Sequence, residues 1–64
     1  MRIDRKKLAF LMFEKEMTTK DLHNKCGVSR QTLCYIRNGK SCALATAVKI
    51  AAALGVEVTE LLED

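Results

Sequence analysis

Between residues 29 and 41 the chain carries side chains that could make directional hydrogen bonds to a large polar partner. If this stretch is helical, Leu33 and Ile36 define its buried side, since a helix turns by about 100° per residue. The side chains that then point outward are Gln31, Cys34, Tyr35 and Asn38, and those on the flanks are Arg30, Thr32 and Arg37. Such groups pair with nucleic-acid base edges and phosphates. An ordinary solvated helix face is the alternative interpretation.

Other chemistries lack a matching set of residues. The single histidine, His23, follows no zinc-ligand spacing, and no two of Cys26, Cys34 and Cys42 are spaced C-x-x-C. One histidine among short helices gives no Ser-His-Asp, Cys-His or paired-carboxylate arrangement. We therefore expect no enzymatic activity, no metal and no cofactor.

Cysteine number and hydropathy suggest where the protein works. The chain has three cysteines, an odd number that cannot all pair in disulfides, which favours reduced thiols in a cytoplasmic protein. No apolar run is long enough to span a membrane, so we expect no membrane partner. The register of the helices further predicts that Cys26 is a core thiol and that Cys34 is accessible.

Charge is distributed unevenly along the chain. Residues 1–40 hold ten Lys and Arg against four Asp and Glu, whereas residues 41–64 hold one Lys against four acids. The two parts carry +6 and −3, which sum to the net +3 of the chain. A basic front and an acidic tail favour a polyanion-binding surface in the first two thirds, with Lys49 and residues 57–64 facing away from it.

Glycines and capping residues predict the helices that position these groups. Gly27, Gly39 and Gly55 each follow an apolar periodic segment, so helices should end near Cys26, Asn38 and Leu54. The predicted N-terminal caps are Thr18 with Asp21 three residues on, Ser29 and Ser41. A first helix should cover about Asp4 to Lys15, and a short last one about Glu57 to Glu63. No segment alternates apolar and polar residues, so we predict five short helices, an all-α fold and no strands.

Periodicity also predicts which helix faces are buried. Leu8, Leu11 and Met12 should point inward from the first helix. The inward positions predicted for the fourth helix are Leu44, Ala47, Val48, Ala51 and Leu54. Phe10 and Phe13 give the first helix more apolar surface than its core face needs, so either could mark a partner surface or cap the small core.

The runs TTKDLHNKCGVSRQTLCYIRNGKS and AAALGVEVTELL resemble the lambda-repressor and Cro family of helix-turn-helix domains. The matching positions are Leu22, Gly27, Val28, Ser29, Thr32, Leu33, Ile36, Asn38, Gly39, Ala51, Leu54, Gly55, Val56, Leu61 and Leu62. The resemblance covers nearly the whole chain. It implies one compact five-helix DNA-binding domain over residues 1–64.

The resemblance also implies which residues contact DNA. Thr19, at the start of the second helix, matches a phosphate-contact position, and Lys20 beside it is included. Residues 29–35 match the recognition segment of the major groove, with Arg30, Gln31 and Cys34 at base-reading positions. The residues that match backbone-contact positions are Tyr35, Arg37, Asn38, Lys40 and Ser41.

Two positions depart from the family pattern. His23 replaces the usual alanine where the second and third helices come close, so it is either a partly exposed packed side chain or a pH switch. Met12 and Arg37 stand where the family often has an Arg–Glu ion pair. That pair is absent, and Arg37 is expected to be free to meet DNA.

The sequence therefore favours a sequence-specific regulator of transcription, a Cro-like repressor in type, that binds double-stranded DNA as a homodimer. By resemblance, Leu61 and Leu62 are expected at the dimer surface. The alternative is a protein-interaction module of the same fold, such as an antitoxin-like protein that contacts its partner through Phe10 and Phe13. An enzyme fragment is the remaining, least favoured alternative.

Overall fold

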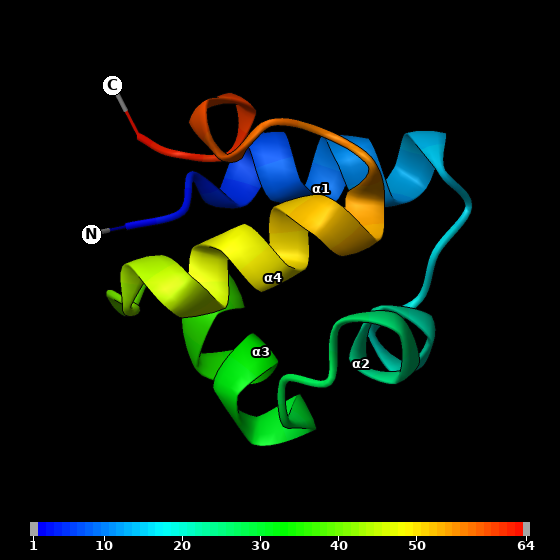
Figure 1. The fold of residues 1–64 in the computed structure, drawn as a ribbon, viewed down its shortest axis with the longest axis horizontal. Coiled ribbons are helices and arrows are strands. Elements are labelled where there is room, and N and C mark those ends of the chain that lie inside the picture. The colour runs from blue at the N-terminus through cyan, green and yellow to red at the C-terminus, as the bar shows by residue number, and fades with distance from the viewer. Residues whose placement is uncertain (1, 64) are drawn as a thin grey trace.

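The computed structural model describes residues 2–63, in which four α-helices and one short 3-10 helix form a single layered core. The elements are α1 (Arg5–Glu14), α2 (Thr19–Cys26), α3 (Arg30–Arg37), α4 (Leu44–Leu54) and η1 (Val58–Glu60). In Figure 1, α4 crosses the middle of the molecule, with α2 and α3 below it and α1 and the C-terminal turn above it. The all-α prediction is confirmed for the described residues, although the number of α-helices is four.

Local capping explains why the first three helices begin where they do. The Asp4 carboxylate accepts hydrogen bonds from the backbone of Lys6 and Lys7, at 2.9 and 3.2 Å. Thr18 and Asp21 form a reciprocal capping box at the start of α2. The Ser29 hydroxyl accepts from the backbone N–H of Thr32 at the start of α3. These contacts satisfy amides that the first turn of a helix leaves unpaired, and they confirm the predicted caps at Thr18 and Ser29.

Glycine ends two of the helices. Gly27 after α2 and Gly55 after α4 have φ values of 74° and 73°, in the left-handed region. A side chain would strain that conformation, whereas glycine adopts it freely. The helix ends predicted near Cys26 and Leu54 are therefore confirmed.

The core gathers apolar side chains from every α-helix and from both ends of the described chain. Its fully buried members include Leu8, Leu22, Leu33, Ile36, Ile50 and Leu61. α4 packs against both α2 and η1, so this apolar helix occupies the centre of the molecule. The buried apolar side chains thereby hold the α2–α3 pair in a fixed position on the rest of the domain.

The start of α4 differs from the prediction. Ser41 does not cap this helix, which begins at Leu44 after Ala43, and no side chain caps it. Cys42 is half-buried and packs against the core. The chain therefore runs on past Ser41 before the helix begins, and the capping preference of serine is overridden by packing.

The buried face of α4 also differs from the prediction. The residues that face the core are Ala47, Ile50, Ala51 and Leu54. Leu44 and Val48, predicted to be inward, are 55% and 47% exposed. α4 contains only one charged residue, Lys49, so its sequence fits the same periodic pattern in two registers, and the sequence alone did not distinguish them.

The predicted fifth helix over residues 57–63 is only the single 3-10 turn η1. It stops because the next residues pair with the N-terminal segment. The Asp4 N–H donates to the Leu61 carbonyl at 2.7 Å, and Ile3 and Leu62 form an antiparallel bridge. The Leu61 side chain is fully buried in the core, so the expectation that it lies on a dimer surface is wrong.

Candidate nucleic-acid interface

The helix pair α2–α3 is joined by a short turn whose apolar residues face inward. Leu22 and Leu33 are fully buried, and Val28 is 9% exposed. The Val28 N–H donor nitrogen lies 3.4 Å from the Cys26 sulfur, which belongs to a half-buried side chain. These residues close the two helices on one another, as the sequence predicts for a helix-turn-helix. The turn fixes the direction in which α3 leaves the core.

His23 fits this turn without disrupting it. Its ring is half-buried, and Nδ1 lies 2.7 Å from the Val28 carbonyl oxygen. Nδ1 carries the proton in this contact, because a carbonyl can only accept. Both the neutral ring with that tautomer and the doubly protonated ring keep this hydrogen bond. The geometry supports a packed histidine that fastens α2 to the turn.

One side of α3 is open to solvent and carries the side chains predicted from the sequence. Its exposed residues are Arg30, Gln31, Cys34, Tyr35 and Arg37, with Asn38 just beyond. Thr32 is half-buried, and its hydroxyl accepts from the Ser29 hydroxyl at 2.8 Å. The predicted register of this helix is therefore confirmed. Whether these residues contact DNA stays a prediction.

Two of the exposed side chains on α3 are joined. Gln31 Nε2 donates to the Tyr35 hydroxyl oxygen at 2.9 Å. The residues are one helical turn apart, which is the spacing at which side chains on a helix meet. A terminal amide has two N–H donors and a carbonyl acceptor, so Gln31 keeps one N–H and its Oε1 available. Tyr35 thus orients the Gln31 amide, a role that was not predicted from the sequence.

Arg37 connects the two helices of the motif. Its Nη1 donates to the Thr19 hydroxyl at 2.6 Å, from the end of α3 to the first residue of α2. Both residues are predicted to contact DNA, and the structure brings them together. Arg37 is therefore less free than the sequence implied. Eighteen residues separate the pair, so no local pattern could have revealed it.

Eight of the residues predicted to contact DNA line two open hollows. Thr19, Cys34, Arg37 and Asn38 line one open hollow of about 370 Å³. A second hollow of about 470 Å³ includes Thr32, Tyr35, Lys40 and Ser41 in its lining. The other four, Lys20, Ser29, Arg30 and Gln31, line neither hollow. The two groups are therefore separate, and both include exposed residues of α3.

Asn38 turns back onto its own helix. Its Nδ2 donates to the Cys34 carbonyl at 3.0 Å and lies 3.5 Å from the Cys34 sulfur. The same carbonyl also accepts from the Asn38 backbone N–H at 3.0 Å, so the side chain adds a second hydrogen bond to a carbonyl that is already paired. The Asn38 side chain therefore helps to hold the end of α3, in addition to the contact with the DNA backbone that is predicted for it.

Negative charge is almost absent from this part of the protein. The sequence has no Asp or Glu between Asp21 and Glu57. The Thr18 N–H donates to the Asp21 carboxylate at 3.0 Å, and this hydrogen bond holds the pKa of Asp21 below its ordinary value. Within residues 2–63 no group of His, Cys, Asp and Glu is arranged to hold a metal ion. In the same range no helix is long and apolar enough to cross a membrane. Because the stretch between Asp21 and Glu57 has no carboxylate side chains, its exposed hydrogen-bond donors and positive charges are suited to binding an anion.

Solved structures of similar fold belong to much longer chains. Native PhpD with cadmium atoms is 31% identical, with a TM-score of 0.85, and the match covers 100% of this chain and 14% of that one. A mutant of hydroxyethylphosphonate dioxygenase is also 31% identical, with a TM-score of 0.88 over the same shares of the two chains. No curated protein matches the sequence. The fold therefore occurs as a small part of longer chains, among them a hydroxyethylphosphonate dioxygenase.

The family assignment comes from the sequence profile of the Cro/C1-type HTH DNA-binding domain, which matches residues 7–64. That range contains all of α2, α3 and α4 and most of α1. The resemblance predicted from the helix-turn-helix residues is confirmed by this match. The chain belongs to the Cro/C1-type helix-turn-helix DNA-binding family.

Proposed function

We propose that this protein is a sequence-specific regulator of transcription that binds double-stranded DNA with α3 in the major groove. The observation that carries the proposal is the exposed side of α3, where the Gln31 amide is oriented by Tyr35 in a region without carboxylates. A glutamine amide matches the N6 and N7 edge of adenine. Because the N-terminal part of such a helix enters the groove most deeply, Gln31 would read a base.

Phosphate contacts would surround this base contact. Thr19 begins α2, and the amides at a helix N-terminus favour a phosphate. Arg37, which donates to the Thr19 hydroxyl, adds a guanidinium at the same place. We therefore assign this pair to the DNA backbone, where it would raise affinity without choosing the sequence.

We further propose that the protein acts as a repressor, as a homodimer and without chemistry of its own. A repressor needs only to occupy its operator and exclude other proteins from it. Two copies on a two-fold site would read twice as many base pairs as one, which is how this docking mode reaches useful selectivity. The surface through which two copies would meet lies elsewhere than at the buried Leu61.

Selection of bound sequences from a pool of random duplex DNA tests the proposal directly. We expect enrichment of a two-fold symmetric site, bound with an affinity that falls steeply with salt. Each neutralised phosphate contributes about −0.9 to the slope of log affinity against log salt. Absence of enrichment together with absence of binding at low salt would contradict the proposed function.

A protein partner is the second candidate, and the exposure of α1 favours it. Phe10 and Phe13 are 62% and 83% exposed. Phe10 lines an open apolar hollow of about 580 Å³ with Leu11, Lys6, Lys7 and Glu60. Exposed aromatic side chains of this kind commonly mark protein contacts. If this candidate alone is correct, the random pool will show no enrichment, and replacing both phenylalanines will abolish partner binding.

A further inference from the structure

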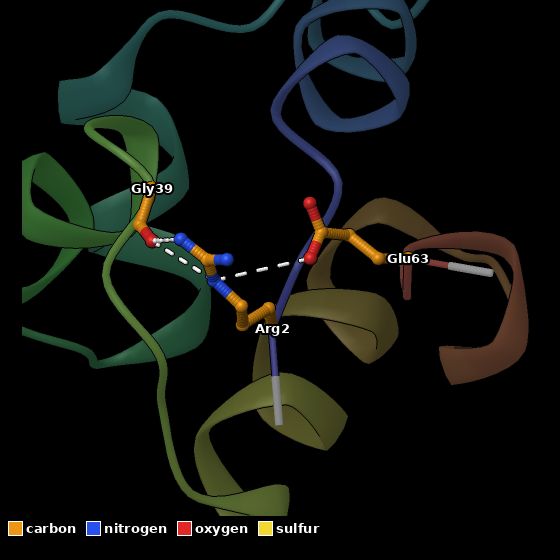
Figure 2. A network of polar contacts seen from close by, with 3 residues as sticks. All are labelled: Arg2, Gly39 and Glu63. Carbon is orange, nitrogen blue, oxygen red and sulfur yellow. Dashed lines mark hydrogen bonds and ion pairs between the residues drawn. The ribbon is translucent and has the colours of Figure 1, made fainter.

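Three segments that are distant in the sequence meet at the Arg2 side chain, which contacts Gly39 just after α3. Arg2 donates to the Gly39 carbonyl from Nε at 3.2 Å and from Nη2 at 2.6 Å. The same Nε lies 3.8 Å from a carboxylate oxygen of Glu63. Figure 2 shows the Arg2 side chain between these two groups. The N-terminal segment is thereby held against the end of the helix that we propose enters the groove.

A second guanidinium approaches the same residue. A methyl group built on the Gly39 Cα would lie 3.7 Å from Arg2 Nη2 and 3.8 Å from Arg5 Nε. Arg5 is exposed, and its side chain makes no hydrogen bond or ion pair within residues 2–63. Lys40, the next residue along the chain, is exposed as well. We call Arg2, Arg5 and Lys40 the Gly39 cluster.

The cluster has more positive charge than the described part of the chain neutralises. Glu63 is the acidic partner of Arg2, and both side chains are about half exposed, so water screens their attraction. Arg5 has no acidic partner within residues 2–63. Like charges held close together repel, and binding an anion between them relieves that repulsion. A guanidinium also matches the oxygens of a phosphate with two parallel hydrogen bonds.

We propose that the Gly39 cluster is a second phosphate-binding site, which contacts the DNA backbone beside the C-terminal end of α3. This inference rests on the proposed function and extends it to Arg2 and Arg5, which lie outside the helix-turn-helix. A guanidinium has five N–H donors, and Arg2 commits two of them to Gly39. Arg5 keeps all five, so it is the principal phosphate contact, while Arg2 keeps three.

The test compares Arg5→Gln with wild type on one duplex, by fluorescence anisotropy over a range of salt concentrations. Removing a phosphate contact should weaken binding to all sequences alike and reduce the salt slope by about 0.9 for each phosphate that is no longer neutralised. Arg2→Gln should act in the same direction. Lys49→Gln on α4 removes the same charge from an exposed lysine outside the cluster, and it should leave the slope unchanged.

Thermal melting of each variant separates a binding role from a structural one. Arg5→Gln should melt as wild type does, because Arg5 has no polar partner within residues 2–63, so its binding defect is decisive even if Arg2→Gln destabilises the fold. An Arg5→Gln slope equal to that of a wild type that binds DNA would overturn the cluster while leaving the proposed function intact. A wild type that binds no duplex would instead overturn the proposed function, and the cluster with it.

Discussion

At Gln31 the proposed reading of a base depends on one hydrogen bond, which the side-chain amide donates to the Tyr35 hydroxyl. Gln31→Ala should relax preference at one base pair of each half-site, a loss of about 1–3 kcal/mol in discrimination. Tyr35→Phe removes only the hydroxyl that holds the amide, and it should reproduce part of that loss. The double variant should be no worse than Gln31→Ala alone, because the hydroxyl acts through the amide. Selection from a random duplex pool measures each preference.

Arg37→Ala is the matched control for this prediction. It should lower affinity for all sequences alike and reduce the salt slope by about one unit, as removal of a phosphate contact does. A changed sequence preference for Arg37→Ala, combined with an unchanged one for Gln31→Ala, would contradict the roles assigned to both residues.

The three thiols should differ in reactivity, because the thiolate is the reactive form and must be accessible. Cys34 is exposed, whereas Cys26 and Cys42 are half-buried, and burial raises the pKa of the Cys42 thiol. Mass spectrometry after brief alkylation should find Cys34 modified first. Bound duplex should then protect Cys34 selectively, since it lies on the side of α3 that would enter the groove. Equal labelling with and without a duplex that binds would place another surface against DNA.

Among the elements, α2 is the one whose start we expect to depend on pH. The Thr18 backbone hydrogen bond lowers the pKa of Asp21 from its ordinary value of 3.8. A carboxylate with a lowered folded-state pKa contributes stability above its unfolded pKa, and this stability is lost as pH falls through the folded value. Asp21→Asn should therefore melt below wild type at neutral pH, with a difference that shrinks as pH falls below 3.8.

Glu14→Gln is the control for this pH dependence, since Glu14 is exposed and its side chain makes no hydrogen bond within residues 2–63. Its melting temperature should differ from that of wild type by an amount that changes little over the same acid range. A constant difference between Asp21→Asn and wild type throughout that range would show that the capping box does not make α2 sensitive to acid.

The sequence predicted the elements whose ends depend on local contacts. α2 and α3 begin at side-chain caps and α2 ends at Gly27, and each of these signals lies within a few residues of the boundary it sets. The start of α4 and the short η1 depend instead on packing of Cys42 and pairing of Leu62 with Ile3. Such contacts between distant residues leave no local pattern.

The candidate site divides in the same way. The outward register of α3 followed from Leu33 and Ile36, because a helix with a clear apolar side has only one register. The spacing of Gln31 and Tyr35 could have suggested their contact. The Arg37–Thr19 hydrogen bond and the approach of Arg2 to Gly39 depend on how the helices pack, so only the structure reveals them.

At the scale of the whole molecule, most large apolar side chains lie in the core, and the two most exposed ones, Phe10 and Phe13, lie on α1. Leu61→Asp should unfold the domain, because it places a carboxylate where the side chain is fully buried. Phe13→Ser should leave the melting curve almost unchanged, because Phe13 is 83% exposed. Circular dichroism measures both. Native-like melting of Leu61→Asp would contradict the packing of the C-terminal segment.

Association is a separate measurement on the same surface. If Phe10 and Phe13 form a contact between proteins, the Phe10→Ser/Phe13→Ser variant should lose that association while it keeps binding to a DNA half-site. Light scattering with and without duplex measures the mass of each complex. An unchanged mass in both conditions would remove α1 from the partner surface.

The bridge between Ile3 and Leu62 also bears on how this domain could be joined to other proteins. The bridge holds the first and last parts of the described chain side by side. A host protein could therefore accept the domain as an insertion in a surface loop, because the two points of attachment would lie close together. Two short linkers would then limit rotation of the inserted domain more than one linker could. An enzyme or reporter fused at both ends should therefore keep a fixed orientation relative to α3, whereas fusion at one end would allow the two parts to rotate relative to each other.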